Sequence, residues 1–243
     1  ETFAFRDVEL SLSDVRDLRV YPVVHGTDGD DTLSGTTNPE VIVGYDGDDE
    51  FRPAGGNDDL FGGDGIDQLF LNQLVDFEVP PNSQYRFDID MAAGTVTGDE
   101  NTNIISFQDI EMVHGSDSKD RFRGSENSEA FNGFQGRDLF FASAGGDTID
   151  GGSGKDTLSF FKWGRDAGSN DANALDLVSL ILNAEGAPPS GAELSGIIVD
   201  LDDSDNGTHW AAGLEVTSIE RIIGTTQNDV FVSSDASIDV RGK

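Results

Sequence analysis

The chain has 243 residues and a strongly acidic composition, with 47 Asp and Glu against 15 Lys and Arg and a formal net charge of −32. Because this charge repels a phosphate backbone and no basic patch offsets it, nucleic acid is excluded as a partner. The chain has no cysteine, which excludes disulfides and thiol chemistry. No apolar run approaches the roughly 18 residues of a membrane span. With 36% hydrophobic residues, the composition is close to that of a disordered chain.

Residues 1–25 are predicted to end a preceding unit or to form an N-terminal cap. The segment TFAFRDVEL reads as a strand, and SLSDVRDL reads as a Ser-capped helical turn. The chain begins without Met, and its last residues, Gly242 and Lys243, resemble the first two positions of a further repeat. We therefore expect a fragment of a longer parent protein.

Two arrays of nine-residue units follow, with five units in residues 26–70 and five in residues 115–159. The clearest copies read GGDGIDQLF and GGSGKDTLS. The eighth position is apolar in every unit: Leu33, Ile42, Phe51, Leu60, Leu69, Phe122, Phe131, Phe140, Ile149 and Leu158. The sixth position is acidic in every unit: Asp31, Glu40, Asp49, Asp58, Asp67, Asp120, Glu129, Asp138, Asp147 and Asp156. Such a fixed period indicates a repeat architecture.

The order of residues within a unit predicts a coiled chain. Positions 1, 2 and 4 are often Gly, which adopts positive φ without steric cost, so the first six residues can form a tight turn. The last three residues read as a short strand, in which only position 8 points inward. Two units then complete one coil of 18 residues, and turns 18 residues apart stack about 4.8 Å apart.

This stacking brings together the position-6 carboxylates of units i and i+2. Calcium binds six to eight oxygen ligands at about 2.3–2.6 Å, so a gap between two carboxylates suits it. The predicted pairs are Asp31 with Asp49, Asp49 with Asp67, Glu40 with Asp58, Asp120 with Asp138, Asp138 with Asp156, and Glu129 with Asp147. The alternative for each turn is a metal-free turn capped by side-chain hydrogen bonds.

The units resemble the G-G-x-G-x-D-x-U-x repeat of the RTX (repeats-in-toxin, hemolysin-type) calcium-binding family. The resemblance implies that backbone carbonyls of the Gly-rich turns supply the remaining calcium ligands. It predicts an all-β fold, a right-handed parallel β-roll built of calcium-binding nonapeptide repeats, with spacer strands and one short helical insertion. It also implies secretion by a Gram-negative bacterium through a type I exporter, which reads a signal outside this chain.

The motif positions give a set of candidate metal-binding residues, and three pairs per array suggest about six calcium ions or more. The candidates are Gly26, Asp28, Gly29, Asp31, Glu40, Gly44, Asp46, Gly47, Asp49, Asp58, Gly62, Asp64, Gly65, Asp67, Asp117, Asp120, Glu129, Gly133, Gly136, Asp138, Asp147, Gly151, Gly154, Asp156 and Asp229. The second unit of each array departs from the motif, with Asn at position 4 and Glu at position 6. The row that contains Glu40 and Glu129 is therefore the weaker one.

Spacers of different length, residues 71–114 and 160–223, follow the arrays. The first contains YRFDIDM and TNIISFQDIEMV, and the second contains GIIVDLD and LEVTSIERII, which match as strands. Residues 171–186 of the second spacer have apolar residues at helical spacing and predict a short helix packed on the roll. Residues 224–243 begin a third, truncated array that keeps Asp229 at position 6.

The chain lacks the motifs of the common catalytic sites, so we expect no enzyme. It contains no HExxH zinc motif and no GxSxG nucleophile turn. His25 and His114 occupy the same place before an array, which favours a structural role, and His209 lies in a loop-like stretch. Calcium is the one cofactor that the sequence predicts.

Two functions are consistent with these patterns. The first is a calcium-binding RTX β-roll module of a larger secreted protein, which folds on binding calcium outside the cell and supports export and stability. The alternative is a carbohydrate- or surface-binding module, either an adhesin or an accessory to a polysaccharide-active enzyme. Its aromatic binding strip would be sought at Phe161, Trp163 and Trp210. The expected partners are calcium, the parent chain, and an extracellular polysaccharide or cell surface.

Overall fold

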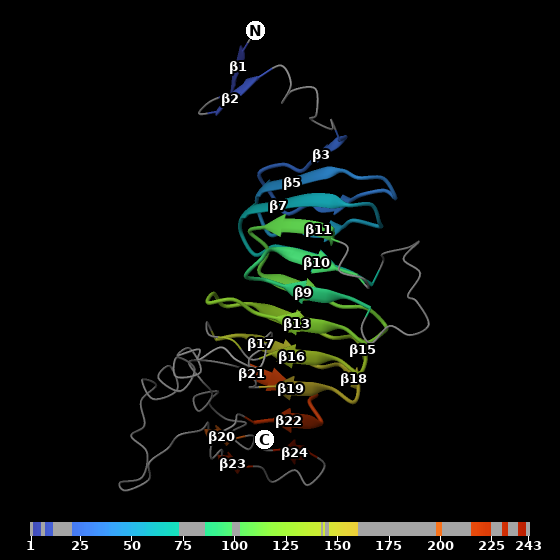
Figure 1. The fold of residues 1–243 in the computed structure, drawn as a ribbon, viewed down its shortest axis with the longest axis vertical. Helices are drawn as coiled ribbons and strands as arrows, with labels where there is room; N and C mark the ends of the chain where they lie inside the picture. Colours follow the sequence, from blue (N-terminus) through green and yellow to red (C-terminus); the bar gives the residue numbers. More distant parts are fainter. Residues whose placement is uncertain are drawn as a thin grey trace, which may run out of the picture.

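The computed structural model describes residues 2–5, 8–11, 21–72, 86–98, 103–141, 143, 146–159, 198–200, 215–224, 230–232 and 238–241. Every regular element within these ranges is a β-strand, and most of the strands are paired in parallel in two long sheets (Figure 1). The prediction of an all-β parallel β-roll is therefore confirmed. The predicted helix at 171–186, together with Phe161, Trp163, Trp210, His209 and Asp229, lies outside the described residues. Within the described ranges, no helix has the length and apolarity to cross a membrane.

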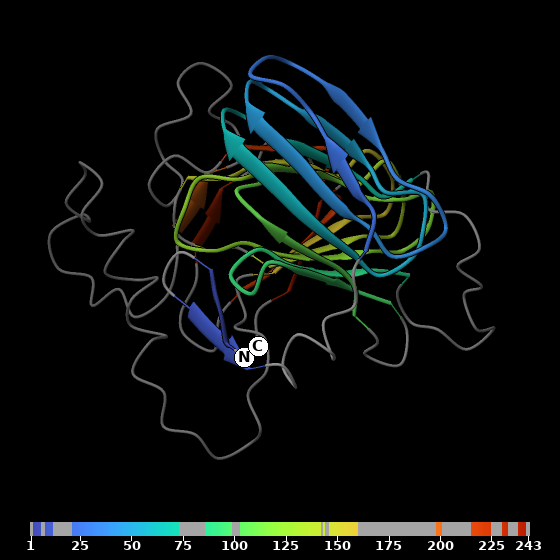
Figure 2. The ribbon, with the colours of Figure 1, turned by 90° about the horizontal axis from the view of Figure 1, so that it is seen from above.

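The first array forms the coils that its spacing predicts. Its successive strands alternate between the two sheets, and within the array strands 18 residues apart pair in parallel, so that Ile42 lies opposite Leu60 and Leu33 opposite Phe51. The strands are β3 (Val23–His25), β4 (Thr32–Ser34), β5 (Val41–Asp46), β6 (Glu50–Arg52), β7 (Asp58–Asp64) and β8 (Gln68–Phe70). Figure 2, viewed along the stack, shows the coils lying over one another.

The second array repeats this arrangement. Phe122 lies opposite Phe140, and Phe131 opposite Ile149, again at an interval of 18 residues. Two short strands in the turns also pair in parallel. The elements are β12 (Met112–His114), β13 (Arg121–Arg123), β14 (Ala130–Asn132), β15 (Gln135–Gly136), β16 (Leu139–Phe141), β17 (Thr148–Asp150), β18 (Ser153–Gly154) and β19 (Thr157–Ser159).

The first spacer adds strands to one sheet only. It contributes β9 (Asp88–Asp90), β10 (Thr95–Thr97) and β11 (Asn103–Gln108). Strand β11 pairs in parallel with β7, β10 is antiparallel to both of its neighbours, and β9 pairs in parallel with β13. In the other sheet, β12 alone lies between β8 and β14. The roll therefore gains a hairpin on one side, and the described sheets have eleven and seven strands.

The second spacer shows the same pairings where it is described. Strand β21 (Glu215–Thr217) pairs with β17, as β11 pairs with β7, and β22 (Arg221–Ile223) pairs with β19, as β12 pairs with β8. Strand β20 (Ile198–Asp200) pairs with β23 (Val230–Val232), as β9 pairs with β13, and β24 (Asp239–Arg241) follows on β22. The larger repeat is therefore an array plus a spacer.

The prediction of one strand over TFAFRDVEL is wrong. Two strands, β1 (Thr2–Phe5) and β2 (Val8–Ser11), pair antiparallel there, with Phe5 opposite Val8. The apolar pattern was compatible with either arrangement, because both strands of a hairpin have the same two-residue period. The helical turn predicted over SLSDVRDL has its first residue at the end of β2, and the rest lies outside the described residues.

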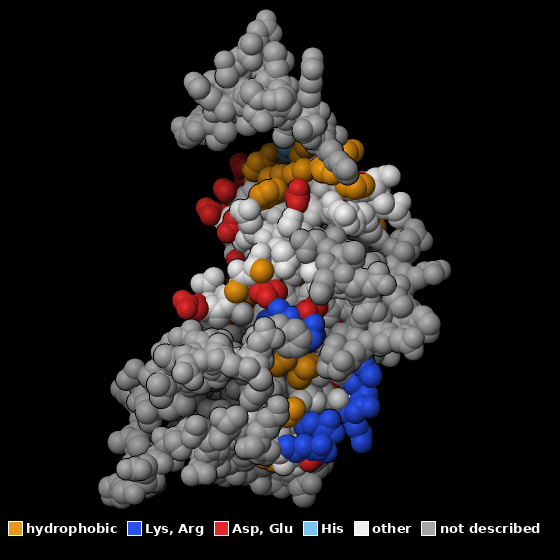
Figure 3. All heavy atoms as spheres, viewed as in Figure 1, with side chains coloured by type: hydrophobic (Ala, Val, Ile, Leu, Met, Phe, Trp, Pro, Cys, Tyr) orange, Lys and Arg blue, Asp and Glu red, His pale blue; other side chains and the backbone are white. Residues whose placement is uncertain are grey.

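The interior of the roll is filled by two rows of apolar side chains, one from each sheet. All ten position-8 residues are buried, as predicted, and the first spacer continues the core with residues such as Ile89, Val96 and Val113. In the second array the first three position-8 residues are Phe, and the ring of Phe122 stacks on that of Phe140 with centroids 4.7 Å apart. Outside this core, some apolar side chains remain exposed on the first coils, including Val23, Tyr45 and Phe61 (Figure 3).

Because each coil of two units contributes only two position-8 side chains to the core, removing a ring should be costly. Phe140→Ala removes a fully buried side chain, and we expect the free energy of unfolding to fall by about 3–5 kcal/mol. The matched control is Ile66→Ala, whose side chain is 55% exposed and which should change stability by less than about 0.5 kcal/mol. Urea unfolding of both variants in one calcium-containing buffer measures the difference. Equal losses would contradict this account of the core.

Candidate metal centres

A ladder of hydrogen bonds runs along each edge of the roll and fixes one oxygen of six of the ten position-6 carboxylates. The backbone N–H of Asp31 donates to Oδ1 of Asp49 at 2.8 Å, and that of Asp49 donates to Oδ1 of Asp67 at 2.9 Å. In the second array, Asp120 N–H donates to Asp138 Oδ1 at 2.8 Å, and Asp138 N–H to Asp156 Oδ1 at 2.8 Å. Each carboxylate is thus held by the coil 18 residues before it.

The same ladder joins the pairs in the weaker row. Glu40 N–H donates to Asp58 Oδ1 at 2.9 Å, and Glu129 N–H donates to Asp147 Oδ1 at 3.2 Å. The structure therefore brings together all six pairs that the 18-residue spacing predicts. Nine of the ten position-6 residues are buried, and Asp31 in the first coil is half-buried.

The second carboxylate oxygen is the one available for a cation. The Oδ2 atoms of five position-6 residues are buried and have no hydrogen-bond partner: Asp49, Asp58, Asp67, Asp138 and Asp156. Leaving a buried charged group without a partner is costly, about 1–3 kcal/mol or more for each. In a native structure such an atom calls for a partner, and an ion is one candidate.

A carbonyl oxygen lies beside these open carboxylate oxygens, across a space that glycine leaves empty. A Cβ atom placed on Gly133 would lie 2.6 Å from Asp138 Oδ2 and 2.5 Å from the carbonyl oxygen of Gly151. A Cβ on Gly44 would clash with Asp49 Oδ2 and would lie 2.6 Å from the carbonyl oxygen of Gly62. Each gap is thus lined by a carboxylate and a carbonyl oxygen, which is the donor set that calcium prefers.

The burial of these carboxylates disfavours their negative charge. Desolvation raises the pKa of Asp138 to about 8, that of Asp58 to about 7 and that of Asp67 to about 6, despite the opposing backbone hydrogen bonds. It likewise raises the pKa of Asp120 and Asp156 to about 6 and that of Glu129 to about 7, and it raises the pKa of Asp49 and Asp147. A bound cation would reverse this effect, because a nearby positive charge favours the carboxylate form.

Other turns are capped by side-chain hydrogen bonds, the alternative that the sequence left open. In the first unit, Thr27 donates from N–H and Oγ1 to Asp31 Oδ2, at 2.6 and 2.8 Å. Ser116 does the same for Asp120, at 2.6 and 2.8 Å. The second units repeat this cap, with Thr36 donating to Glu40 and Ser125 to Glu129, and in a fourth unit Ser143 donates to Asp147. The open carboxylates thus lie in the third and fifth units and at Asp58.

The row that contains only Asp changes edges between the arrays. In the first array its members precede β4, β6 and β8 of the seven-stranded sheet. In the second array its members precede β13, β16 and β19 of the eleven-stranded sheet. The open carboxylates of this row, Asp49 and Asp67 in the first array and Asp138 and Asp156 in the second, therefore lie on opposite edges of the roll, which the linear sequence did not reveal.

Four candidate residues at position 3 lie apart from these rows. The side chains of Asp28, Asp46, Asp64 and Asp117 are exposed, and Asp117 Oδ1 accepts a hydrogen bond from Gln135 Nε2 at 3.1 Å. At position 4, Gly47, Gly65, Gly136 and Gly154 have positive φ angles between 119° and 150°. Glycine is needed there for the turn itself, and Gly29 at the same position faces open space.

Within the described ranges, no three His, Asp or Glu side chains converge on one point. This is compatible with sites that combine one or two carboxylates with backbone carbonyls, because the carbonyl oxygens then supply the other ligands. It excludes, for these residues, a centre built from three such side chains, as in catalytic zinc sites.

Two acidic residues in the rows were missed by the sequence analysis. Asp67 N–H donates to Glu111 Oε2 at 2.9 Å, and Asp156 N–H donates to Glu220 Oε2 at 2.8 Å. A signal was present, because each Glu stands two residues before a buried apolar residue, Val113 or Ile222, as position 6 stands before position 8. Both residues lie outside the uninterrupted nine-residue period, which hid them.

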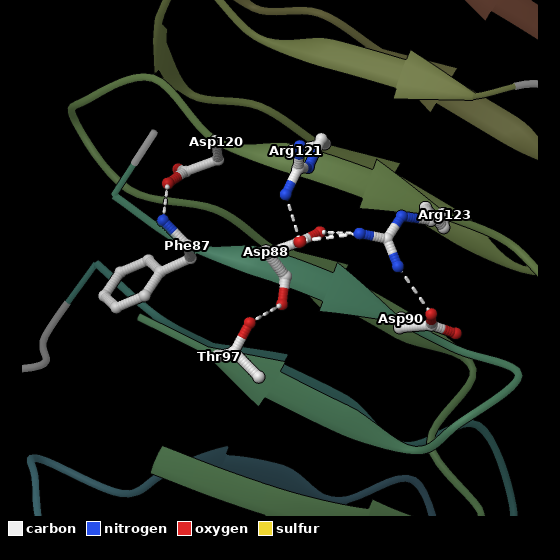
Figure 4. Close-up of polar contacts among 7 residues, drawn as sticks. All are labelled: Phe87, Asp88, Asp90, Thr97, Asp120, Arg121 and Arg123. Atoms are coloured by element: carbon white, nitrogen blue, oxygen red, sulfur yellow. Dashed lines mark hydrogen bonds and ion pairs between the residues drawn. The ribbon is translucent and has the colours of Figure 1, made fainter. Parts of the chain in front are cut away.

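Ion pairs join the first spacer to the second array (Figure 4). Arg123 bridges Asp88 and Asp90 at 2.6 and 2.7 Å, and Arg121 also pairs with Asp88. Phe87 N–H donates to Asp120 Oδ1 at 3.1 Å, which extends the carboxylate ladder into the spacer. Two of the few basic residues of the chain therefore serve to attach β9 to β13.

Comparison with known proteins identifies the repeats. The family model described as the RTX calcium-binding nonapeptide repeat (4 copies) matches residues 25–58, 34–69 and 132–160. No curated protein matches the chain. RTX nonapeptide repeats bind calcium and form a structural module rather than a catalytic one. Residues 25–69 and 132–160 are therefore RTX calcium-binding nonapeptide repeats, and they are folded as a parallel β-roll.

Proposed function

We propose that this chain is a calcium-dependent folding module of a larger secreted protein. The observation that carries the proposal is the set of five buried carboxylate oxygens without a hydrogen-bond partner. A roll that buries these charges, in a chain of net charge −32, is opposed by desolvation and by repulsion. Calcium removes both penalties, so its binding free energy becomes folding free energy.

The candidate ligands follow from the geometry of the gaps. The carboxylates of Asp49, Asp67, Asp138 and Asp156 would hold ions together with turn carbonyls, such as those of Gly62 and Gly151, and Asp58 would do so in the other row. The predicted total of about six or more ions stays a proposal, because several turns already have side-chain caps that compete with calcium. The position-3 aspartates are weaker candidates, since their side chains are exposed.

The proposal also includes where the protein folds and how it is exported. Proteins with RTX repeats are typically secreted, and weak extracellular calcium modules have Kd values of about 10⁻⁴–10⁻³ M. Such sites would stay empty at low cytosolic calcium and fill outside the cell. We propose type I export from a Gram-negative bacterium, with folding on arrival that supports export and stabilises an attached domain.

We propose the following division of the chain, in which the spacers are structural parts of the roll. It comprises a cap at 1–25, arrays at 26–70 and 115–159, spacers at 71–114 and 160–223, and a third array from 224 to 243. The carbohydrate- or surface-binding alternative depends on aromatic residues outside the described ranges, and no described residue favours it. The flanking sequence of the parent protein would discriminate between an accessory module and an adhesin.

A calcium titration of the purified chain tests the folding switch. We expect a coil-like far-UV circular dichroism spectrum in excess chelator and a β spectrum as calcium rises through about 10⁻⁴–10⁻³ M. Magnesium at equal concentration should not substitute, because it demands a smaller octahedral site and dehydrates reluctantly. A chain that is fully folded in chelator would contradict calcium-dependent folding.

A glycine-to-alanine pair tests the position of one ion. In Gly44→Ala the new Cβ would fill the space between Asp49 Oδ2 and the Gly62 carbonyl, so we expect the loss of one bound ion and a folding midpoint shifted about tenfold to higher calcium. Gly29→Ala is the matched control, because its Cβ would meet nothing within 4 Å. Native mass spectrometry counts the ions. A midpoint shift without ion loss would mean that alanine only strains the turn.

The raised pKa values predict how the calcium-free chain responds to acid. A carboxyl whose pKa is raised from 3.8 in the unfolded chain to about 6–8 in the roll binds more protons when folded. Stability of the calcium-free roll should therefore increase as the pH falls from about 8 to about 5.5, and decrease as the pH rises again. Circular dichroism in chelator at the two pH values measures this. A β signal that weakens on acidification would contradict the buried-carboxylate account.

A further inference from the structure

The three-residue segment Asp109–Ile110–Glu111 takes the place of a six-residue turn at the end of the first array. Glu111 accepts a hydrogen bond from Asp67 N–H, just as Asp67 accepts one from Asp49 N–H, with both distances 2.9 Å. Glu111 thus occupies the next rung of the row. At the end of the second array, Glu220 holds the same place relative to Asp156, at 2.8 Å.

The carbonyl oxygens of Asp109 and Ser218 complete the resemblance to a full turn. Within the array, a Cβ on Gly44 would meet Asp49 Oδ2 and the carbonyl oxygen of Gly62. At the end of the array, a Cβ on Gly62 would clash with Asp67 Oδ2 and with the carbonyl oxygen of Asp109. The spacer carbonyl therefore stands where the first glycine carbonyl of a further unit would stand.

The second array ends in the same way, at the corresponding three-residue segment Ser218–Ile219–Glu220. A Cβ on Gly151 would lie 3.1 Å from Asp156 Oδ2 and would clash with the carbonyl oxygen of Ser218. Both carbonyl donors also share an uncommon backbone conformation, with φ of 54° at Asp109 and 56° at Ser218. Positive φ is rare for residues other than glycine, so its recurrence at both ends indicates a shared geometric requirement.

The carboxylate oxygens that face these gaps have no other partner. Asp67 and Asp156 are fully buried, and the Oδ2 atom of each is buried without a hydrogen bond. An open Oδ2 atom is not a property of every acidic residue in the rows. The Oδ2 atoms of Asp31 and Asp120, for example, accept hydrogen bonds from Thr27 and Ser116. The oxygens at the array ends therefore still call for a cation.

The row does not continue beyond Glu111 in the same form. Strand β12 lies between β8 and β14, so Glu111 is flanked by the turns of Asp67 and Glu129. Glu111 N–H donates to the backbone carbonyl of Asp67 at 3.1 Å, and the carboxylate of Glu129 is bound by Ser125. A cavity of about 140 Å³ lies at this junction, lined in part by Asp109, Glu111 and Glu129. The gap at Asp67 is thus the last one of its row in the first array.

We propose that each spacer completes a terminal calcium site on the array that precedes it. The first site combines the carboxylates of Asp67 and Glu111 with the carbonyl of Asp109, and the second combines those of Asp156 and Glu220 with the carbonyl of Ser218. This deepens the proposed calcium function and rests on it. The two sites make the spacers part of the calcium-bound unit, because calcium would tie each array to the spacer strand that follows it.

Single and double variants of the full 243-residue chain test the proposal. Glu111→Gln and Glu220→Gln each keep an oxygen that can accept the hydrogen bond from Asp67 or Asp156 while removing the charge. Counted by native mass spectrometry across a calcium titration, each variant should lose one ion and the double variant two. Glu126→Gln, at an exposed residue, is the matched control and should keep the full number.

The outcomes separate this proposal from the one on which it rests. If the wild-type chain binds calcium and the double variant binds the same number of ions, the terminal sites are overturned and the calcium module stands. If the wild-type chain binds no calcium, the proposed function falls and the terminal sites fall with it.

If the variants fail to fold, crystallography of the wild-type protein with calcium shows whether ions occupy the two terminal sites. Anomalous density between Gly62 and Asp109 and between Gly151 and Ser218 would support the sites. Density at the Asp49 gap with none at these two positions would overturn them.

Discussion

The burial of a carboxylate at nearly every turn is the constraint on which the rest of the roll depends. In six of these carboxylates one oxygen accepts a backbone N–H from the neighbouring coil, and this bond is consistent with the register between coils along both edges. The other oxygen then lies in the turn, away from water. The interaction that aligns the coils is therefore also the one that places negative charge where solvent cannot stabilise it.

The hydrophobic core cannot offset this charge without help. Each nine-residue unit contributes one buried apolar side chain at position 8, so the core is thin. One residue in nine supplies this apolar burial, while all nine lose backbone freedom on folding. Hydrogen bonds between coils reduce the deficit only partly, because their net contribution is small. A cation in the turn acts directly on the unfavourable electrostatic term.

Strictly periodic features could be predicted from the sequence, and features that interrupt the period could not. The ten position-8 residues and the six carboxylate pairs follow from a repeat of nine and a coil of 18 residues, because identical positions recur at identical places. Glu111 and Glu220 belong to the same rows, but a three-residue turn moves them out of the nine-residue window. The hairpin of β9 and β10 and the pairing of Asp88 with Arg121 and Arg123 depend on long-range packing that no local pattern reports.

The number of units per array explains why the row that contains only Asp changes edges. Strand β3 leads into the first array from the eleven-stranded sheet, and β12 leads into the second from the seven-stranded sheet. From β3 to β12 the chain changes sheet seven times, once for each of the five units, once into β9–β11 and once into β12, and an odd number of changes reverses the sheet. Strand β22, which follows the second array as β12 follows the first, lies in the eleven-stranded sheet again, as a second change of sheet requires. An array of six units would have kept the row that contains only Asp on one edge. With five units, the two rows of this kind lie on different edges, while the rows that contain Glu40 and Glu129 occupy the other edge of each array. Carboxylates therefore line both edges along the whole length of the two arrays, and a cation at one edge lies away from the charges of the other.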